Sequence, residues 1–388
     1  MDANRFITHA LGDPRITAIL AAAIDAVQPG KLVLDYLQKA DLPNHDRVFL
    51  LGIGKASEAM TRAAAGFLGD YSEALVITKS TSHQERKRMT VIEGGHPVPD
   101  QRSLAAGQAA LDFVSGLKEN DLLVCLISGG GSALVTVPRD GITLEEIRMQ
   151  TASLLAGGAA IHEINARRRQ LDRIKAGGLA RMTRARVLGL ILSDVIGNSL
   201  ETIASGLTVD PSLGRRVQNV IVGDIRIAAG AAQKQAGLMG FDSDILDLGL
   251  QGEAREVGLQ LAARLKRERR DRKAPFCLIA GGETTVKVQG GGRGGRNQEL
   301  ALAAVDELSG LKNVLFVSLA TDGDDGPTDS AGAVVDGDTH RRAEGLGMSA
   351  SGYLSRNDSY SFFDPLGDLI KCGYTGTNVN DLVFLVGL

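Results

Sequence analysis

Short, uninterrupted apolar runs, each followed at once by a glycine-rich or polar turn, are the feature that most constrains the fold of this chain. The segments between them repeat apolar residues at helical spacing, as in 102–117 with Leu104, Leu111, Val114 and Leu117 on one face. Uninterrupted runs are typical of parallel strands that helices cover on both sides. The sequence therefore predicts an α/β protein with a mostly parallel sheet. The expected strands are 47–51, 73–78, 90–93, 121–127, 187–192, 219–222, 244–248, 276–280, 314–320, 333–335 and 382–387.

A chain of 388 residues exceeds the usual size of one hydrophobic core, so two domains are expected. The charged run 264–273 has no interleaved aromatic residues, and we interpret it as a solvated helix end and connector. It marks the expected boundary. Residues 1–250 are predicted to form a larger α/β domain, and residues 274–388 a second, smaller α/β domain.

Composition excludes several classes of protein. Hydrophobic residues make up 44% of the chain and charged residues 23%, which is typical of globular domains and not of disordered or fibrous ones. The net charge of −3 gives no indication of nucleic acid or an anionic membrane as a partner. The three cysteines lack metal-binding spacing, no apolar run approaches the roughly 20 residues of a membrane span, and no secretion signal is evident. We expect a soluble, cytoplasmic protein, and a homodimer is compatible with the sequence.

The 48 glycines gather at strand ends, where backbone N–H groups can approach an anion closely. The first such loop, 52–57, reads Gly-Ile-Gly-Lys-Ala-Ser. It resembles the start of a dinucleotide fingerprint, but it lacks the acidic residue about 20 positions later and carries Lys55, which a pyrophosphate turn does not need. Lys55 is predicted to contact a bound or transferring phosphate. A solvated lysine at a helix start is the alternative.

The second loop, 128–132, reads Ser-Gly-Gly-Gly-Ser and directly follows an apolar run. Its row of N–H groups at a helix start suits a carboxylate or a phosphate. The lysine and the spacing of a Walker A loop are missing, so a P-loop ATPase is not expected. A tight turn without a ligand is the alternative.

The third loop, 290–299, follows a glycine pair at 281–282 and carries Arg293 and Arg296 ahead of a helix-forming segment. Two arginines in a glycine run are costly to order without an anionic partner, so Arg296 is predicted to face phosphate. A disordered hairpin tip is the alternative.

The fourth loop, 321–329, reads Thr-Asp-Gly-Asp-Asp-Gly-Pro-Thr-Asp and follows another apolar run. Clustered carboxylates at a strand end suit Mg²⁺, which prefers oxygen ligands and bridges to nucleotide phosphates. Calcium is the rival metal, but the spacing of an EF-hand loop is not met. The predicted metal ligands are Asp322 and Asp325.

Three further features lie outside these loops. Asp194 follows an expected strand, at the edge where open α/β sheets bind ligands, and is predicted to act as a base or a metal ligand. Positive charge gathers over 165–169 and at Lys175, with a solvated amphipathic helix as the alternative. His96, in the loop 94–99, is the histidine whose setting best suits a functional role.

These loops, in this order, resemble the glycerate 2-kinase family, whose members combine an N-terminal Rossmann-like domain with a C-terminal MOFRL domain. The resemblance covers almost the whole chain. It is carried by the segments 51–57 (LGIGKAS), 94–100 (GGHPVPD), 126–134 (LISGGGSAL), 164–180, 192–195 (LSDV), 203–211, 281–286 (GGETTV), 294–303 (GGRNQELALA), 321–333 (TDGDDGPTDSAGA) and 375–382 (TGTNVNDL).

The resemblance implies ATP- and Mg²⁺-dependent phosphorylation of D-glycerate to 2-phosphoglycerate, in an active site in the cleft between the two domains. Lys55 and Arg296 are then expected to stabilise the transferring phosphoryl group, and Asp194 to complete the catalytic set. The expected nucleotide contacts are Gly129, Gly130, Gly131, Ser132, Glu283 and Asn297, the expected substrate contacts are Ser128, Arg168, Lys175 and Asn378, and the expected metal ligands are Asp322 and Asp325.

The chain also departs from the family pattern. Ile196, Leu207 and Tyr374 stand where relatives carry proline. Gln170 replaces an expected histidine, and residues 197–199 replace an acidic run. These changes leave the kinase expectation intact and keep a related small sugar acid open as the substrate.

Two rival functions remain. An NAD(P)H-dependent hydroxypyruvate reductase would need a nicotinamide site, for which the loop 52–57 is the only support. A non-catalytic metabolite-binding protein would bind its ligand without turnover, so Lys55→Ala would weaken binding and abolish no activity.

Overall fold

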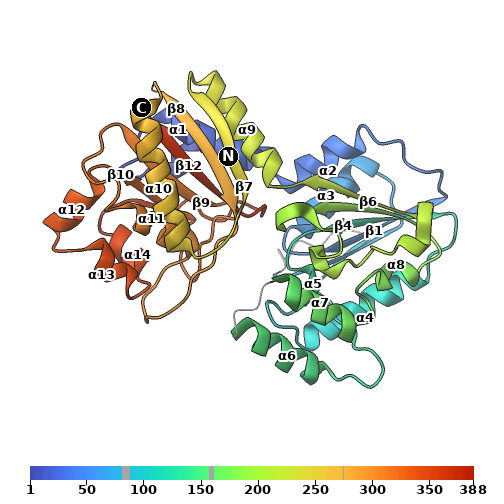
Figure 1. Ribbon diagram of the computed structural model, residues 1–388. Helices are drawn as coiled ribbons and strands as arrows, with labels where there is room; N and C mark the ends of the chain where they lie inside the picture. Colours follow the sequence, from blue (N-terminus) through green and yellow to red (C-terminus); the bar gives the residue numbers. More distant parts are fainter. Residues whose placement is uncertain (81–87, 157–160, 274) are drawn as a thin grey trace. The chain divides into compact units, whose positions relative to one another are not determined.

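The fold is described from a computed structural model, which covers residues 1–80, 88–156, 161–273 and 275–388. The chain forms two compact units (Figure 1). The inserted unit is Gln28–Asp224, and the outer unit combines Met1–Val27 with Ile225–Leu388. Each unit contains one six-stranded sheet and a buried hydrophobic core of its own.

The sheet of the inserted unit is parallel throughout, with the strand order β3-β2-β1-β4-β5-β6. This is the doubly wound Rossmann order, in which the chain starts in the middle of the sheet and builds outward in both directions. After a charged first residue, the central strands β1, β4 and β5 are apolar because helices cover both faces, and all of β4 is buried. The strands are β1 Arg47–Ile53, β2 Glu73–Thr78, β3 Met89–Glu93, β4 Asp121–Ile127, β5 Arg186–Leu192 and β6 Val217–Gly223.

Helices α2 and α3 cover one face of this sheet, and α4 lies on the other (Figure 1). Helix α4 begins at a capping box, in which the Asp100 carboxylate accepts from Ser103 N and Ser103 Oγ accepts from Asp100 N. The helices of the unit are α2 Pro29–Leu37, α3 Ser57–Leu68, α4 Gln101–Ser115, α5 Gly131–Leu134, α6 Leu144–Ala156, α7 Ile161–Leu171 and α8 Gly178–Arg181, with 3-10 turns η2 Ile196–Asn198, η3 Ile203–Ser205 and η4 Pro211–Arg216.

The sheet of the outer unit is mixed, with the order β11-β10-β9-β12-β8-β7. Only β7 and β8 pair in parallel; the other neighbours are antiparallel. The strands are β7 Asp242–Leu250, β8 Phe276–Gly282, β9 Val314–Ala320, β10 Gly332–Asp336, β11 Leu369–Ile370 and β12 Asp381–Gly387.

Helices α10 and α11 pack on one face of the outer sheet, and α1 and α9 on the other (Figure 1). The approach of α10 to α11 depends on Gly258, because a methyl group there would lie 2.2 Å from the carbonyl oxygen of Leu300. The helices of the unit are η1 Ala3–Phe6, α1 Pro14–Ala26, α9 Ile225–Leu238, α10 Ala254–Asp271, α11 Arg296–Ala304, α12 Thr339–Gly345, α13 Ala350–Leu354 and α14 Ser359–Phe363.

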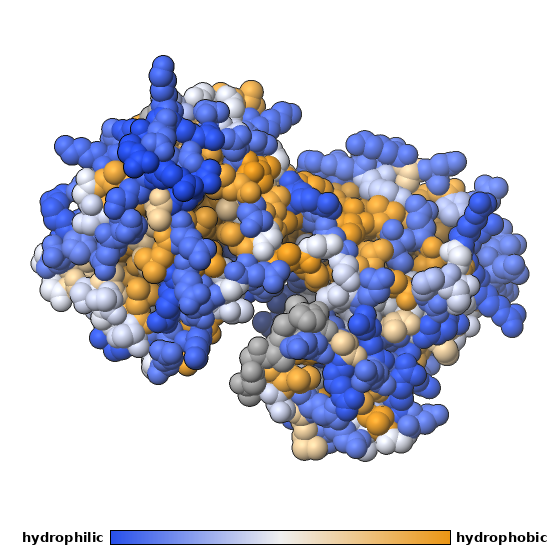
Figure 2. All heavy atoms as spheres, viewed as in Figure 1, coloured by the Kyte–Doolittle hydropathy of each residue, from blue (hydrophilic) through white to orange (hydrophobic). Residues whose placement is uncertain are grey.

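The charged run 264–273 forms the C-terminal half of α10 and the residues that follow it. Figure 2 shows hydrophilic residues gathered over this helix. Its arginines pair with nearby carboxylates, such as Arg264 with Glu268 at 2.6 Å and Arg272 with Asp244 at 2.6 Å. The interpretation as a solvated helix end is confirmed, but the run lies inside the outer unit.

The division of the chain therefore differs from the expected one, because residues 1–27 and 225–250, expected in the first domain, belong to the outer unit. The strand predicted at 244–248 is β7, and its ladder hydrogen bonds go to β8 of the outer sheet. Helix α1 packs against α9 and so also belongs to the outer unit. Both pairings join segments far apart in sequence, which local patterns of apolar residues do not encode. No single helix within the described residues is long and apolar enough to cross a membrane; only the bent pair α1 and α2, counted together, has that length and composition.

Candidate active site

Three loops of the inserted unit follow the carboxyl ends of neighbouring strands. Lys55 follows β1, the turn 128–132 follows β4, and Asp194 follows β5. Ile53 of β1 and Ile127 of β4 are paired in register, so these two strands end at the same level. The direction of strand addition reverses between β1 and β4, and ligands of open α/β sheets bind at this point.

The loops after β1 and β4 hold each other in place. Lys55 N donates to Gly129 O at 2.9 Å, and Ala56 N donates to Ser128 Oγ at 3.0 Å. Gly54 has a φ of 136°, and a methyl group on it would lie 2.2 Å from Ser128 Oγ. Ser128, predicted to contact substrate, is itself buried and uses its hydroxyl to fix the backbone next to Lys55.

The glycine turn after β4 brings three predicted side chains together. A methyl group on Gly129 would lie 1.8 Å from Asp194 Oδ2. One on Gly130, which has a φ of 82°, would lie 3.2 Å from both Lys55 Cγ and His96 Cδ2. Lys55, His96 and Asp194 thus surround a stretch of backbone that only glycine can provide.

Arg168 of α7 is a buried cation beside the same turn, with 6% of its surface exposed. Its Nη1 donates to Ser132 Oγ at 3.3 Å and its Nη2 to Pro97 O at 3.0 Å, while the buried Nε has no hydrogen-bond partner. Burial lowers the pKa of Arg168 to about 10. Within the described residues no carboxylate lies at ion-pairing distance from Arg168. A buried charge of this kind is costly without a counter-ion, so the site is suited to an anionic ligand.

Ser132 is held on its other side by a chain of side-chain hydrogen bonds. Ser132 Oγ and Ser205 Oγ lie 2.6 Å apart, and Ser205 Oγ donates to Asn165 Oδ1 at 3.1 Å. Gly131 and Ser132 begin the short helix α5 and are both buried. Their predicted contact with nucleotide stays a prediction, while the geometry places Ser132 directly against Arg168.

Lys175 has a structural position, which corrects the predicted contact with substrate. Its side chain is 1% exposed, and Nζ donates to Ser132 O and Val135 O, both at 2.8 Å. Nζ also pairs with Asp172 at 3.1 Å. All three hydrogens of the ammonium group are therefore used within the protein, and Lys175 supports the backbone of α5 from below.

In the outer unit, Arg296 stands at the first position of α11 between two carboxylates. Its Nη1 donates to Glu283 Oε1 at 2.6 Å, and its Nε and Nη2 donate to Asp381 at 2.6 and 3.2 Å. Burial alone would lower the pKa of Arg296, but Asp381 and Glu283 outweigh it and raise the pKa. Asp381 pairs in register with Gly282 of β8, so three elements converge on the guanidinium.

Asp325 caps helix α11, which corrects its predicted role as a metal ligand. Its two carboxylate oxygens accept from Asn297 N at 3.0 Å and Gln298 N at 2.9 Å. Burial raises the pKa of Asp325 to about 6. Because the carboxylate is 2% exposed and both oxygens are engaged, it is poorly placed to bind an ion.

Asn297 is also less accessible than predicted. Its side chain is buried, Oδ1 accepts from Ser318 Oγ at 2.6 Å and Nδ2 donates to Asp325 Oδ1 at 3.4 Å. These contacts lock the first turn of α11 against β9. The predicted contact of the Asn297 side chain with nucleotide is therefore not supported.

The remaining predicted residues of the outer unit lie in two loops that bind each other. Thr375 Oγ1 donates to Thr321 O at 2.6 Å, and Thr375 N donates to Asp322 O at 3.1 Å. Asp322 Oδ1 accepts from Asp324 N at 3.1 Å, and Asn378 Oδ1 accepts from Asn380 N at 3.1 Å. Asp322 and Asn378 are half-buried, at the same sheet edge as Arg296.

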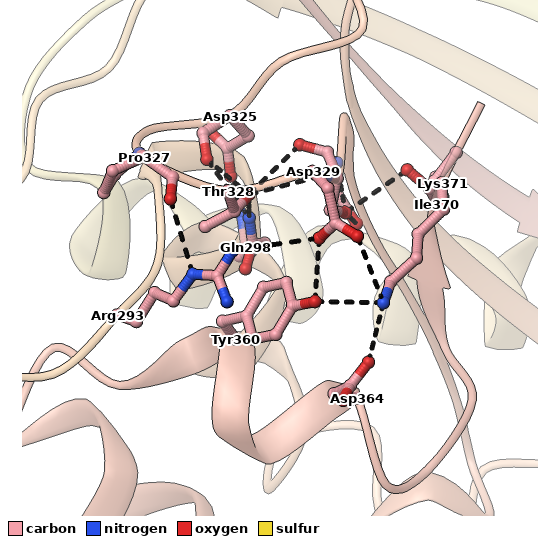
Figure 3. A network of polar contacts seen from close by, with 12 residues as sticks. Arg293, Gln298, Asp325, Pro327, Thr328, Asp329, Tyr360, Asp364, Ile370 and Lys371 are labelled. Carbon is pink, nitrogen blue, oxygen red and sulfur yellow. Dashed lines mark hydrogen bonds and ion pairs between the residues drawn. The ribbon is translucent and has the colours of Figure 1, made fainter. Parts of the chain in front are cut away.

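The glycine run before Arg296 is anchored, in contrast to the alternative of a disordered hairpin tip (Figure 3). Arg293 lies over the ring of Tyr360, 4.0 Å from its centroid, and Nε donates to Pro327 O at 3.4 Å. Tyr360 OH donates to Asp329 Oδ1 at 2.7 Å and accepts from Lys371 Nζ at 2.9 Å. Tyr360 and Asp381 are not among the site residues that the sequence predicts, because neither stands in a glycine-rich loop.

The departures from the family pattern fall in different environments. Leu207 is buried in the hydrophobic core of the inserted unit. Gln170 is exposed on α7 and accepts from Arg167 Nη1 at 2.9 Å, whereas Tyr374 is 61% exposed. Leu207 therefore has a packing role, and the other two lie at the protein surface.

Comparison with known proteins shows which family models and relatives this chain matches. Residues 15–233 match the model of a domain of unknown function, DUF4147, and residues 276–381 match the MOFRL family. The D-glycerate 2-kinase of Thermotoga maritima is 39% identical over 94% of this chain and 96% of its own length. A protein of Agrobacterium vitis named putative hydroxypyruvate reductase is 36% identical over 88% of this chain and 100% of its own length.

The fold is shared with a solved structure. The crystal structure of glycerate kinase from Thermotoga maritima has a TM-score of 0.87 and 38% sequence identity, and the match covers 96% of this chain and 98% of that one. The strand order, the glycine turns at the ends of β1 and β4, and these matches over nearly the full length agree. The chain belongs to the glycerate 2-kinase family.

Proposed function

We propose that this protein is an ATP-dependent kinase that phosphorylates D-glycerate on its 2-hydroxyl group, giving 2-phosphoglycerate and ADP. The hydroxyl oxygen on C2 forms a bond to the γ-phosphorus, the bond from that phosphorus to the β–γ bridging oxygen breaks, and the hydroxyl proton passes to a base. The names of the relatives support this activity. The observation that carries it is Arg168, a buried cation with no carboxylate at ion-pairing distance in the described chain, which contacts Ser132 in the glycine turn after β4.

The inserted unit supplies groups that suit both the carboxylate and the reacting centre of glycerate. Arg168 offers donors to the carboxylate, and Ser132 accepts from Nη1 and helps to hold the guanidinium in place. Asp194, against Gly129, is the proposed acceptor of the proton from the 2-hydroxyl. Lys55 is the proposed cation for the transferring phosphoryl group, because phosphoryl transfer asks mainly for positioning and for positive charge around the equatorial oxygens.

Arg296 of the outer unit is the second proposed cation for the nucleotide phosphates. Asp381 fixes its guanidinium through two hydrogen bonds, and the more exposed Glu283 holds a single Nη. Exchange of Glu283 for a phosphate oxygen would therefore leave the guanidinium oriented by Asp381. Glu283 stays a proposed neighbour of the nucleotide, and Asn378 a proposed neighbour of the substrate.

The proposed metal is Mg²⁺. Within the described residues no three His, Cys, Asp or Glu side chains are grouped as a metal site. Mg²⁺ commonly takes one or two carboxylates and completes its shell with phosphate oxygens and water, so a single carboxylate at a strand end fits it. Asp322 would hold the ion, which supplies charge neutralisation to the β- and γ-phosphates when it is bound.

A hydroxypyruvate reductase is the rival activity, and the name of one relative favours it. Its only support in the sequence is the loop 52–57, and that loop carries Lys55, which a pyrophosphate turn does not need.

A coupled assay separates the two activities. We expect ADP release that requires both D-glycerate and ATP, and phosphorus NMR of the product should place the phosphate on C2. Oxidation of NAD(P)H by hydroxypyruvate, with no glycerate-dependent ADP release, would refute the kinase proposal. A panel of three- and four-carbon hydroxy acids then shows whether D-glycerate or a related sugar acid has the highest kcat/KM.

A further inference from the structure

His96 lies against the glycine turn after β4, and none of the roles above uses it. Its Cδ2–Nε2 edge faces Gly130, since a methyl group on that glycine would lie 3.2 Å from Cδ2 and 3.3 Å from Nε2. The next residue, Pro97, accepts a hydrogen bond from Arg168 Nη2 at 3.0 Å. His96 is therefore the sequence neighbour of a residue that binds the buried Arg168. We call Arg168, Lys55 and the turn 128–132 the anion site.

The surroundings of His96 keep its ring uncharged. Burial is the largest cause, and the nearby cations Lys55, Lys79 and Arg168 add to it, so that the pKa of His96 is lowered to about 4. A neutral imidazole presents one N–H donor and one bare nitrogen acceptor. In the part of the chain that the structure describes, no donor or acceptor forms a hydrogen bond with this ring.

The anion site is rich in donors and poor in acceptors. Lys55 and Arg168 can only donate, and the backbone of the glycine turn presents N–H groups. Ser128 Oγ accepts from Ala56 N, and Ser132 Oγ accepts from Arg168. A hydroxy acid brings hydroxyl hydrogens that need acceptors, and the Asp194 carboxylate and the neutral His96 imidazole are acceptors that lie directly against the glycine turn.

We propose that His96 accepts a hydrogen bond from the second, non-reacting hydroxyl of the substrate, and so selects dihydroxy acids over monohydroxy acids of the same length. The inference rests on the proposed kinase function. Asp194 is the better base because it is a carboxylate, so it takes the reacting hydroxyl, whereas the weakly basic imidazole takes the hydroxyl on C3. An acceptor left without its hydrogen bond penalises an analogue that lacks this hydroxyl.

The substrate pair that tests this is D-glycerate and D-lactate, which have the same configuration at C2 and differ only in the C3 hydroxyl. Wild type is expected to prefer D-glycerate in two measurements. The kcat/KM for ATP-dependent phosphorylation should be higher for D-glycerate than for D-lactate, and the KM for D-glycerate should be lower than the inhibition constant of D-lactate. In His96→Ala this preference should fall at least about tenfold, because the variant loses affinity for D-glycerate and not for D-lactate. The KM for ATP should stay within about twofold of wild type, since His96 does not contact the nucleotide in this proposal.

Two further variants control the result. His45→Ala removes an exposed histidine of the same unit, whose Nδ1 lies 2.7 Å from Pro43 O, and should leave the preference unchanged. His96→Asn keeps an oxygen acceptor, and part of the preference should return. If His96→Ala does not fold, His96→Asn and His96→Phe carry the comparison, with thermal unfolding as the check of folding.

The possible failures are distinguishable. If wild type transfers no phosphate to D-glycerate, the kinase proposal fails and this inference fails with it. If the enzyme is active but the preference for D-glycerate over D-lactate is the same in wild type and the His96 variants, the inference alone is overturned. A rise in the KM for ATP without a change in that preference would assign His96 to a phosphate and would also overturn it.

Discussion

Arg168 Nη1 donates to Ser132 Oγ across 3.3 Å, although the two residues are 36 positions apart in the chain. The contact joins helix α7 to the start of α5, and it fixes a buried guanidinium at the carboxyl end of the central strands. Two hydrogen bonds hold the planar group, and its buried Nε has no hydrogen-bond partner.

Replacement of Arg168 by lysine should therefore weaken substrate binding. Lysine keeps the charge but loses the planar fork that pairs with a carboxylate. We expect the KM for D-glycerate to rise about tenfold or more, with a smaller change in kcat. Steady-state kinetics of Arg168→Lys measure this. Arg167→Lys, a change on the exposed side of the same helix, should behave as wild type, and an unchanged KM in Arg168→Lys would remove Arg168 from substrate binding.

Arg296→Ala should lower kcat far more than it raises the KM for D-glycerate. The guanidinium is oriented by Asp381, and a preorganised cation acts mainly on charge that develops in the transition state. We expect a loss of about 100-fold or more in kcat. Arg293→Ala on the same glycine run is the matched control, because Arg293 lies over Tyr360 and is proposed to have no contact with phosphate. Turnover of Arg296→Ala close to wild type would exclude Arg296 from the reaction.

Lys175→Met should reduce stability, because it leaves the buried carboxylate of Asp172 without its cation. Loss of one partner of a buried ion pair typically costs about 3–5 kcal/mol in the free energy of unfolding. Chemical denaturation measures the loss, and Lys39→Met at an exposed position should change it by less than about 0.5 kcal/mol. Asp172→Asn combined with Lys175→Met should recover part of the loss. A folded Lys175→Met variant of normal stability but with a raised KM would restore the predicted substrate contact.

Asp325 should make the stability of the outer unit depend on pH. Its pKa is raised from 3.8 to about 6 in the folded protein, so between these values the folded state binds a proton that the unfolded state has released. The stability contributed by this group is complete below about pH 4 and is lost as the pH rises to about 6. The difference in Tm between wild type and Asp325→Asn should therefore fall from pH 4 to pH 6. Asp324→Asn, at the exposed neighbouring position, should show no such trend, and neither outcome depends on activity.

The alternation of strands and helices was predictable because it is written in local apolar patterns. Strands β2, β4 and β9 have the predicted bounds, and the α/β class is confirmed. The membership of strands in sheets was not predictable in the same way. Nothing within 244–248 tells whether its partner is β6 or β8, because the answer depends on hydrogen bonds to a segment about 30 residues later.

Some side chains of the candidate site were predictable from local sequence, and others depend on partners that are distant in the chain. Glycine turns after strands identified Lys55 and the 128–132 loop, and the structure brings them together with Asp194. The predicted ligand contacts of Lys175 and Asp325 differ from their positions in the structure. A charged residue near a glycine has the same appearance in sequence whether it faces a ligand or supports the fold. Only the buried partners, Asp172 for one and the N–H groups of α11 for the other, distinguish the two cases. The roles of Lys55, Asp194 and Arg296 stay predictions until the kinetics are measured.

The interrupted course of the outer unit has a consequence for biosynthesis. Residues 1–27 leave the ribosome first, yet two of their hydrogen-bond partners lie near the end of the chain: Ala10 N donates to Asp368 Oδ1 at 2.8 Å, and Thr377 Oγ1 donates to Val27 O at 2.6 Å. At roughly 5–20 residues per second, α1 waits on the order of tens of seconds for these partners to be translated. During that interval the whole of Gln28–Asp224 emerges and can complete its sheet, so the apolar helix α1 has no packing partner from its own unit until α9 has been translated.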